Sequence, residues 1–334
     1  MFLFAVRGNP VELSTVFEPG LSNISCYRIP AVVQTPAGTL LAFAEARHGS
    51  CSDGNVHEIA VRRSTDGGRS WSPVNFAVGN STYWVGNPAV VYSHLSSRVV
   101  LLFVNHASGC VGGCGTGNGM VTSSDDGVSW SEPTDLSKQF GPASGSLPGP
   151  GVASELFKGR LAVPCHHGAY QEDYVVVSDN GGDIWFPINQ TFKGMDEATM
   201  TKTGDGNVIL NMRHRDATSK GRAVAVSHDN GITFGDIYYD KSLRSPVCQA
   251  SIASIGNVTY FSNPDSSSAR QSISVKCSND FTHTWPGDQV VYPGSSYGYS
   301  CLVAGALASG SGGLLYEADK SSIKFSSFSL QCPP

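Results

Sequence analysis

The feature of this sequence that most restricts its possible folds is an eight-residue pattern that recurs along the chain. The first copy, residues 64–71, reads Ser-Thr-Asp-Gly-Gly-Arg-Ser-Trp. Residues 123–130 and 227–234 repeat its Ser, Asp and Gly positions and end on Trp and Phe. A pattern that returns at a regular interval indicates a repeat architecture, in which each copy belongs to one structural unit.

Two weaker copies occupy the remaining intervals. Residues 178–185 carry Asn180 in place of the Asp and Ile184 in place of the Ser, and residues 278–285 carry Thr282 in place of the Gly. The copies begin roughly 54 residues apart, about the length of one four-stranded propeller blade. The 334 residues therefore have room for six blades. We predict that the two ends of the chain share one blade, as in closed propellers.

The residue types of the repeat suit a β-hairpin. Asp and Ser side chains can accept hydrogen bonds from the backbone of their own turn, and Gly takes the positive φ that tight turns require. The terminal aromatic residue is expected to anchor the turn on the next strand. These properties predict a structural role for the repeat.

Composition and local patterning agree with an all-β chain. With 38 Gly, 18 Pro and only 15% charged residues, the sequence is typical of short strands joined by tight turns. No sustained stretch has apolar residues at helical spacing, whereas residues 40–43, 99–104 and 208–212 resemble strands. Length alone would also allow two domains, but we predict a single domain over residues 1–334, an all-β six-bladed β-propeller.

The charge of the chain restricts its partners. A formal net charge of −5 and the absence of any run of Lys or Arg argue against nucleic-acid binding. A small anionic ligand remains possible if a few Arg side chains gather locally. No apolar stretch approaches the roughly 20 residues of a membrane span, so we expect none, and residues 1–6 are too short for a signal peptide.

Cysteines and glycosylation motifs bear on the compartment. The nine Cys are an odd number, so at least one thiol is free or pairs outside the chain, and the pairing is left open. Asn-x-Ser/Thr motifs lie at Asn23, Asn80, Asn189 and Asn257. They favour passage through the secretory route, so we expect a secreted, extracellular or lysosomal protein.

The repeat resembles the Asp box of the sialidase superfamily, where it lies on hairpins away from the active site. Asp boxes also occur in proteins that only bind partners, so the repeat alone does not distinguish an enzyme from a binding protein. Residues outside the repeat must decide.

Three segments resemble those that carry the family's carboxylate-binding arginines. Residues 27–30, Tyr-Arg-Ile-Pro, are similar to a motif near the start of sialidase domains and imply that Arg28 is the first of the three. Similar segments later in the chain imply Arg213, which is preferred to Arg215 because it completes an Asn-x-Arg match, and Arg270. The planar fork of a guanidinium suits bidentate binding of a carboxylate.

A second group of matches concerns the acid/base residue. Residues 41–47 resemble the family strand after which a loop delivers an acidic residue, and Asp53, before Gly54, matches it best. The alternative is that Asp53 is merely solvated or turn-forming. Arg47 resembles a family arginine that helps hold the sugar or the neighbouring carboxylate.

The remaining matches imply the nucleophile and its base. Tyr299 lies in a segment, Gly-Tyr-Ser-Cys-Leu, that resembles the family's nucleophile segment, and it is preferred to Tyr297. Glu197 resembles the family's glutamate and has a longer arm than its competitor, Asp196. The separation of 16 positions between Glu197 and Arg213 fits two adjacent strands and a hairpin, which would place both side chains at the same end of a blade.

The motif Leu-Leu-Tyr-Glu at residues 314–317 resembles the family's closing segment, in which a glutamate orients the first arginine. The resemblance implies a buried or half-buried ion pair between Glu317 and Arg28. The alternative is a glutamate at a strand edge that faces solvent.

Together the matches run from about residue 27 to residue 325 and imply a retaining exo-α-sialidase that acts on sialylated glycans through a tyrosyl-enzyme intermediate. Two alternatives remain: a trans-sialidase, including an intramolecular one, and a non-catalytic sialic-acid-binding propeller. The complete set of Tyr299, Glu197 and Asp53 argues against the binding protein, which would need only the arginines.

Zinc is a weaker possibility. Cys110 and Cys114 lie near His106, and Cys165 adjoins residues 166–167, which are both His, but no second matched pair follows either group. We therefore expect no metal and no cofactor.

Overall fold

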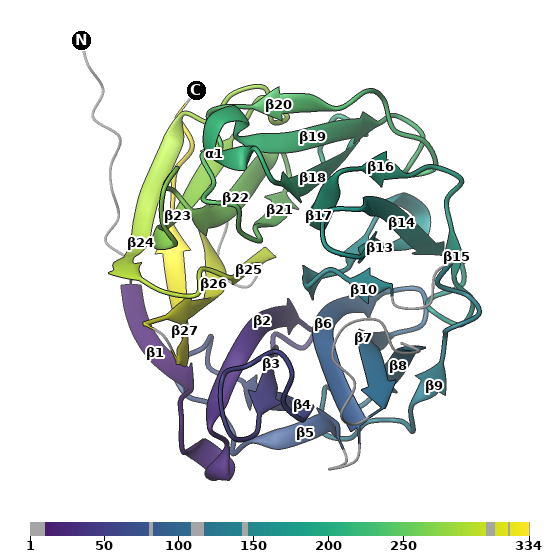
Figure 1. The fold of residues 1–334 in the computed structure, drawn as a ribbon, viewed down its shortest axis with the longest axis vertical. Coiled ribbons are helices and arrows are strands. Elements are labelled where there is room, and N and C mark those ends of the chain that lie inside the picture. Colours follow the sequence, from purple (N-terminus) through teal and green to yellow (C-terminus); the bar gives the residue numbers. More distant parts are fainter. Residues whose placement is uncertain are drawn as a thin grey trace.

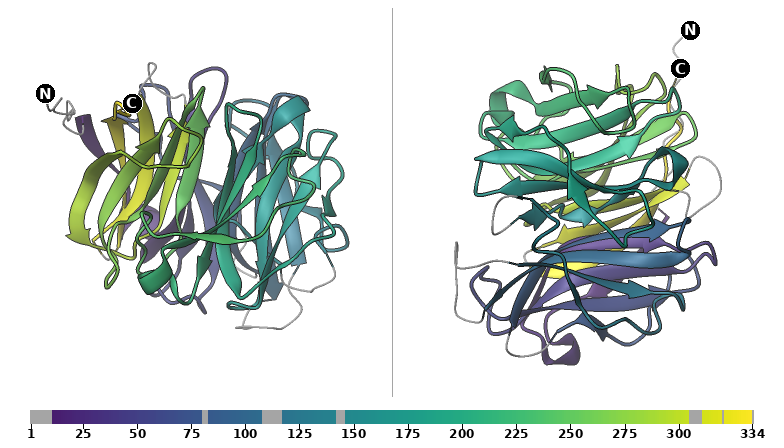
Figure 2. Two further views of the ribbon diagram at one scale, coloured as in Figure 1. Left: turned by 90° about the horizontal axis from the view of Figure 1, so that it is seen from above. Right: turned by 90° about the vertical axis from the view of Figure 1, so that its right-hand side faces the viewer.

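The computed structural model describes residues 11–79, 83–107, 117–141, 146–304, 311–319 and 321–333. Within these residues the strands form six sheets, arranged around a central axis like the blades of a propeller (Figure 1). The strands run between the two faces of the ring, and the connections lie at those faces (Figure 2). The prediction of an all-β six-bladed β-propeller is therefore confirmed.

We number the blades I to VI in chain order. Blade I contains β2 (Cys26–Gln34), β3 (Leu40–Arg47), β4 (His57–Ser64) and β5 (Asn75–Val78). Blade II contains β6 (Tyr83–Ser93), β7 (Arg98–Ala107), β8 (Gly117–Ser123), β9 (Thr134–Asp135) and β11 (Gly151–Val152). Blade III contains β10 (Leu147–Pro148), β12 (Ser154–Glu155), β13 (Leu161–His167), β14 (Glu172–Ser178), β15 (Phe186–Pro187) and β16 (Phe192–Lys193). Blade IV contains β17 (Met195–Lys202), β18 (Val208–His214), β19 (Arg222–Ser227) and β20 (Tyr238–Asp240). Blade V contains β21 (Ser251–Ile255), β22 (Val258–Pro264), β23 (Gln271–Ser278) and β24 (Gly287–Ser295). Blade VI contains β25 (Ser300–Ala304), β26 (Ser311–Ala318), β27 (Ser322–Ser329) and β1 (Val11–Phe17).

Blade VI closes the ring with both ends of the chain. Strand β1 pairs antiparallel with β27, placing Ser14 opposite Phe325, and the two strands lie side by side in Figure 1. The prediction that the ends share one blade is confirmed. Closure leaves no blade without a neighbour, so every blade can bury both of its faces.

The hydrophobic core lies between neighbouring blades. One cluster joins Leu41 and Phe43 of blade I to Leu101 and Phe103 of blade II, and all four side chains are at most 2% exposed. Helices contribute little: in the described residues α1 (Ala217–Lys220) is one turn, and no helix is long and apolar enough to cross a membrane. Two 3₁₀ turns, Leu21–Asn23 and Phe157–Gly159, complete the secondary structure there.

The repeats form the turns between the third and fourth strands of blades I to V. In the first, Asp66 accepts hydrogen bonds from the backbone N–H groups of Arg69 and Ser70, both at 3.0 Å. The hydroxyl oxygen of Ser64 accepts one from the N–H of Gly68 at 2.8 Å. Blade VI has no such turn because its third and fourth strands, β27 and β1, come from the two ends of the chain.

The aromatic residue of the repeat behaves differently from the expectation. Trp71 of blade I packs edge-on against Phe325 at 5.6 Å and donates its indole N–H to Ser14 at 3.2 Å, so its partners belong to blade VI. Trp130 of blade II packs against Phe43 of blade I at 5.6 Å. The prediction of an anchor on the next strand was therefore wrong for these two, because the ring crosses to the preceding blade.

Candidate active site

The eight predicted site residues lie at the face of the ring opposite the repeats. In blade I, the register pairs Arg28 with Glu45 at the end of β2 and β3 that is far from the repeat, whereas Gln34, Leu40 and Ser64 lie at the repeat's end. Blades I, IV, V and VI supply the eight side chains: Arg28, Arg47, Asp53, Glu197, Arg213, Arg270, Tyr299 and Glu317.

β-Bulges in β2 and β17 change the direction of side chains at this face. In β2 the register shifts between Arg28 and Ala31, and Ile29 takes a φ of +59°. In β17 the shift lies between Asp196 and Ala198, so Glu197 is the extra residue. Bulges concentrate next to active sites because they redirect a side chain without ending the sheet. Such a positive φ is costly for a β-branched residue, which indicates that the surroundings hold Ile29 in place.

The sequence reasoning missed these bulges, although a signal existed for some. Pro30 follows Ile29 inside β2, and Pro88 follows Asn87, which has a φ of +50°, at the bulge of β6. Proline cannot donate to a sheet, so proline within a strand indicates an edge or a bulge.

Glu317 holds both Arg28 and the backbone beside Tyr299. Its Oε1 accepts hydrogen bonds from Arg28 Nε at 3.0 Å and from the N–H of Ile29 at 3.1 Å. Its Oε2 accepts one from the N–H of Tyr299 at 3.0 Å. Burial disfavours the charge of Arg28, but Glu317, Tyr299 and Glu45 together outweigh this effect and raise the pKa of Arg28 above its ordinary value. The expected ion pair is present and buried, with side-chain exposures of 10% and 2%.

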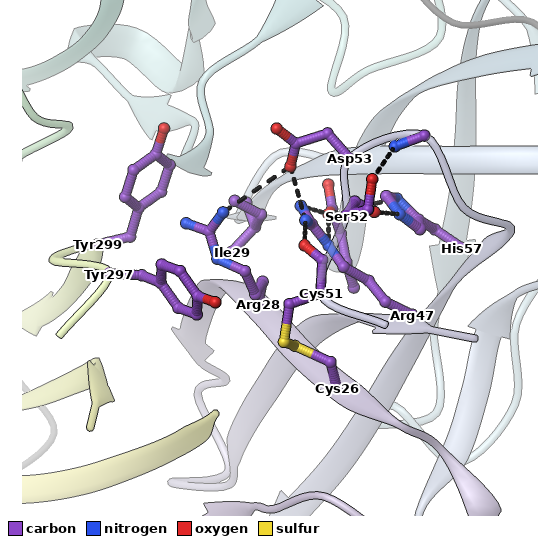
Figure 3. A network of polar contacts seen from close by, with 12 residues as sticks. Cys26, Arg28, Ile29, Arg47, Cys51, Ser52, Asp53, His57, Tyr297 and Tyr299 are labelled. Carbon is purple, nitrogen blue, oxygen red and sulfur yellow. Dashed lines mark hydrogen bonds and ion pairs between the residues drawn. A yellow bond between two sulfur atoms is a disulfide. The ribbon is translucent and has the colours of Figure 1, made fainter. Parts of the chain in front are cut away.

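Asp53 lies on the loop between β3 and β4 and points toward two arginines (Figure 3). Arg47 Nη1 donates to its Oδ1 at 2.6 Å, and Arg28 Nη1 lies 3.8 Å from the same oxygen. The carboxylate side chain is 80% exposed, whereas Arg47 is 2% exposed. Loss of hydration favours the neutral acid, but Arg47 and then Arg28 outweigh it and lower the pKa of Asp53.

Glu45 is a site residue to which the sequence reasoning gave no role. Its Oε2 accepts a hydrogen bond from Arg47 Nε at 2.9 Å, and its Oε1 accepts one from the N–H of Asn87 at 2.8 Å. Burial alone would raise its pKa, but Arg47 and His57 lower it, so the carboxylate is charged at 1% exposure. Because residues i and i+2 share one face of a strand, the spacing of Glu45 and Arg47 was a usable signal.

Glu197, Tyr299 and Arg213 form a hydrogen-bonded triad. The Tyr299 hydroxyl donates to Glu197 Oε1. Arg213 Nη1 donates to Glu197 Oε2 at 2.5 Å and to the Tyr299 oxygen at 3.4 Å. Burial and the Glu197 carboxylate together raise the pKa of Tyr299 well above its ordinary value, although Arg213 opposes them. The phenol is therefore protonated, with a carboxylate in position to take its proton.

The residues that the sequence offered as alternatives to the triad have other contacts. Asp196 turns away, accepting a hydrogen bond from the N–H of Glu197 at 2.7 Å and lying 3.7 Å from His166. The guanidinium of Arg215 lies 4.6 Å from the ring centroid of Tyr170. Tyr297 packs against Arg28, with 4.3 Å between the guanidinium and the ring centroid. None of these three touches the hydroxyl of Tyr299 by a described hydrogen bond.

Three guanidinium groups surround Tyr299. Those of Arg28 and Arg270 lie 5.2 and 5.7 Å from its ring centroid, and Arg213 reaches its hydroxyl. Arg270 is held by the carbonyl oxygens of Tyr297, at 3.0 Å, and Val247, at 3.3 Å. Glu317 and Glu197 balance the charges of Arg28 and Arg213, whereas the described hydrogen bonds of Arg270 go to carbonyl oxygens. The group therefore keeps an excess of positive charge in a chain with a formal charge of −5, as an anion-binding site requires.

The described cysteines include one disulfide and several free thiols. Cys26 and Cys51 form a disulfide. Of the other cysteines that the structure describes, Cys332 is free and half-buried, and four are free and buried: Cys165, Cys248, Cys277 and Cys301. No group of three or more His, Cys, Asp or Glu within the described ranges could hold a metal ion. Of the zinc candidates, Cys110, Cys114 and the side chain of His106 lie outside those ranges.

Comparison with known proteins gives consistent matches. Residues 29–308 match the family described as BNR repeat-like domain, whose repeat corresponds to the eight-residue pattern. The chain is 28% identical to a sialidase of Bacteroides fragilis, covering 95% of this chain and 64% of that protein. It is 30% identical to a sialidase of Micromonospora viridifaciens, with coverages of 93% and 52%. The chain thus spans less than two thirds of the length of these curated relatives.

Among solved structures, the chain is similar to the Hadza microbial sialidase Hz136. The TM-score is 0.85 at 28% sequence identity, over 95% of this chain and 68% of that one. This similarity extends over all six blades, because it covers nearly the whole chain.

Proposed function

Because this chain belongs to the sialidase superfamily, we propose that it is a retaining exo-α-sialidase, a glycoside hydrolase that releases terminal α-linked sialic acids from glycoproteins, glycolipids and oligosaccharides. The observation that carries the proposal is the hydrogen bond from the Tyr299 hydroxyl to Glu197 within a group of three arginines. A lectin would need the arginines but not a tyrosine paired with a base.

The substrate's carboxylate binds to Arg28, Arg213 and Arg270. Charge-assisted hydrogen bonds of this kind are roughly twice as strong as neutral ones. Glu317 and backbone carbonyls already hold Arg28 and Arg270 in place, so little side-chain freedom is lost when the ligand binds.

Tyr299 suits the nucleophilic step for an electrostatic reason. A sialic acid carries its carboxylate on the anomeric carbon, so a carboxylate nucleophile would approach a like charge, whereas a phenol is neutral until it loses its proton. Glu197 accepts that proton as the tyrosine oxygen attacks, and Arg213 stabilises the charge on both partners. A tyrosine nucleophile is a known exception to the two-carboxylate scheme of glycosidases.

Asp53 acts as the acid in the first step and the base in the second. In the free protein its pKa is lowered by Arg47 and Arg28, so the carboxylate is charged. A substrate carboxylate on Arg28 offsets part of this positive field and favours protonation of Asp53 when it is needed. Asp53 then donates to the leaving oxygen and later activates water, and the two displacements retain the anomeric configuration.

The test is to incubate the protein with a fluorogenic α-sialoside and to follow the first product by NMR. The proposal predicts free α-sialic acid as that product. An anhydro or transferred sugar would indicate a trans-sialidase, and tight binding of sialic acid without product would indicate a binding propeller.

We also propose that the protein functions in an oxidising compartment of the secretory route or outside the cell. The Cys26–Cys51 disulfide supports this. The side chains of Asn23, Asn189 and Asn257 are exposed, as glycosylation requires, and Asn80 lies outside the described residues. A loss of mass on N-glycanase treatment of the protein from its native source is expected, and an unchanged mass would remove the support of the motifs.

A further inference from the structure

The loop that carries Asp53 is exposed or half-buried along its length, so polar contacts hold it more than packing does. Its side chains mostly bond within the loop, as when Asn55 donates to the Ser50 hydroxyl at 2.7 Å and the N–H of Gly54 donates to Ser52 at 3.3 Å. The Asp53 side chain is 80% exposed. Packing therefore does not fix the position of this carboxylate, and covalent and polar links to neighbouring segments do so.

Two such links meet at Cys51. Its sulfur is bonded to Cys26, and its carbonyl oxygen accepts a hydrogen bond from Arg47 Nη1 at 2.6 Å. The same Arg47 nitrogen donates to the Asp53 carboxylate. Cys26 is fully buried in β2 and lies opposite Arg47 in the sheet, so the disulfide fastens the loop to a rigid strand (Figure 3).

The spacing along the chain is the same on both sides of the bond. Cys26 precedes Arg28 by two residues, and Cys51 precedes Asp53 by two residues. The disulfide thus connects the strand that carries a carboxylate-binding arginine to the loop that carries the acid/base residue. Trp84, which donates its indole N–H to the Asp53 carbonyl at 2.9 Å, contacts the loop from blade II.

We propose that Cys26 and Cys51 are positioning residues whose disulfide holds Asp53 at the distance from Arg28 that proton transfer to the leaving oxygen requires. This inference rests on the proposed function. The reason is geometric: a misplacement of about 1 Å can cost about 100-fold in rate. The effect concerns proton donation, so it depends on how much the leaving group needs a proton.

Two substrates with different leaving groups separate positioning from general damage. Departure of a sugar hydroxyl, as from sialyllactose, needs general-acid help, which contributes about 10²- to 10⁴-fold. A 4-nitrophenyl sialoside releases a stable anion and needs little help. In Cys26→Ser/Cys51→Ser we expect kcat/KM to fall at least about 10-fold for sialyllactose and less than about 3-fold for the nitrophenyl substrate.

Two controls sharpen the test. Cys332→Ser removes a half-buried free thiol of the C-terminal segment and should leave both values unchanged. In an Asp53→Ala background, loss of the disulfide should cause no further fall with sialyllactose, because residues that act as one unit are non-additive. Equal falls for the two substrates, or a further fall in the Asp53→Ala background, would overturn the proposal.

A folding defect is recognised separately. Circular dichroism and the binding of an unsaturated sialic acid analogue report whether the double variant keeps its fold and its arginine site. If that variant does not fold, the wild-type protein is treated with dithiothreitol instead. The two thiols of dithiothreitol are oxidised to a cyclic disulfide as the Cys26–Cys51 disulfide is reduced to two thiols. The ratio of the kcat/KM values for sialyllactose and the nitrophenyl substrate is then measured before and after the treatment. If the untreated protein cleaves neither substrate, the proposed function itself fails, which is a different result.

Discussion

The two faces of the ring are built in opposite ways. At one face, the backbone turn of each repeat is held by bonds within the repeat, as when Asp66 bonds residues three and four positions ahead, although the rings of Trp71 and Trp130 reach the preceding blade. At the other, Arg28 meets Glu317 across 289 positions, and Tyr299 meets Glu197 across 102. The repeat face depends on local chemistry that can be present in any one blade, whereas the site exists only when blades I, IV, V and VI are assembled. Changes at the two faces should therefore affect different measurements.

The largest effect is expected at the site. Tyr299→Phe removes the oxygen that we propose as the nucleophile but keeps the ring between the guanidinium groups, so turnover should fall at least about 10³-fold while binding of sialic acid remains measurable. The measurement is kcat with a fluorogenic sialoside beside calorimetric binding. Near-normal turnover would show that another residue is the nucleophile.

Removal of one arginine of the proposed carboxylate-binding group should have a smaller effect. Arg270→Ala is expected to raise KM by about 10- to 100-fold, since a hydrogen bond to a charged group contributes about 1.5–3 kcal/mol. Arg270→Lys restores the charge but not the fork and should recover only part of the loss. An unchanged KM in the alanine variant would place the carboxylate elsewhere.

At the repeat face the effect should appear in stability instead. Trp71→Ala removes the packing on Phe325 and the hydrogen bond to Ser14, and we expect the free energy of unfolding to fall by about 2 kcal/mol. The kcat of the folded protein should not change. A urea titration measures the free energy of unfolding, and an assay at 25 °C measures kcat. A variant that loses activity but keeps the wild-type free energy of unfolding would show that the two faces are coupled.

The repeats also make stability depend on acid. Partial burial opposes ionisation, but hydrogen bonds from Thr233 and Ser227 lower the pKa of Asp229 to about 2. Its stabilising effect is therefore complete above the unfolded pKa near 3.8 and is lost as the pH falls toward 2. Asn180 makes similar bonds without a charge in the third repeat. Asp229→Asn should lower the stability of the protein at neutral pH and make its stability fall less steeply between pH 4 and 2. Thermal melts across that pH range measure this. A fall in stability as steep as that of the wild type would contradict the prediction.

The smallest effect is expected in the fifth repeat. Thr282 has a φ of +77°, where the first four repeats have Gly. Thr282→Gly relieves this strain but adds freedom to the unfolded chain, so we expect a net gain of about 0.5 kcal/mol. A lower urea midpoint than wild type would show that the threonine side chain contributes more than its backbone costs.

The sequence was sufficient for what depends on local pattern. The repeat interval predicted six blades, and the alternating runs at 40–43 and 208–212 lie in β3 and β18. The separation of Glu197 and Arg213 correctly predicted neighbouring strands with both side chains at one end. The catalytic roles of these residues stay predictions until they are measured.

What the sequence did not reveal depends on contacts between distant segments. The partner of Cys26 could not be chosen among nine cysteines, because pairing follows from the register of β2 and β3 and the course of the Asp53 loop. The ring of Trp71 has no local partner, so its contact with blade VI could not be foreseen. Bulges such as that at Glu197 change the register by one residue, which a period-2 pattern does not record.

The closure of blade VI by β1 and β27 has a consequence for synthesis on the ribosome. Strand β1 is made before the five blades that lie between it and β27 in the sequence, and β27 is the strand it pairs with in the described sheets, so its edge stays unpaired while those blades are produced. Tyr299 and Glu317 both belong to this late segment. The proposed catalytic site therefore cannot be complete before the ring is closed, so sialidase activity, once measured, would report that folding has finished.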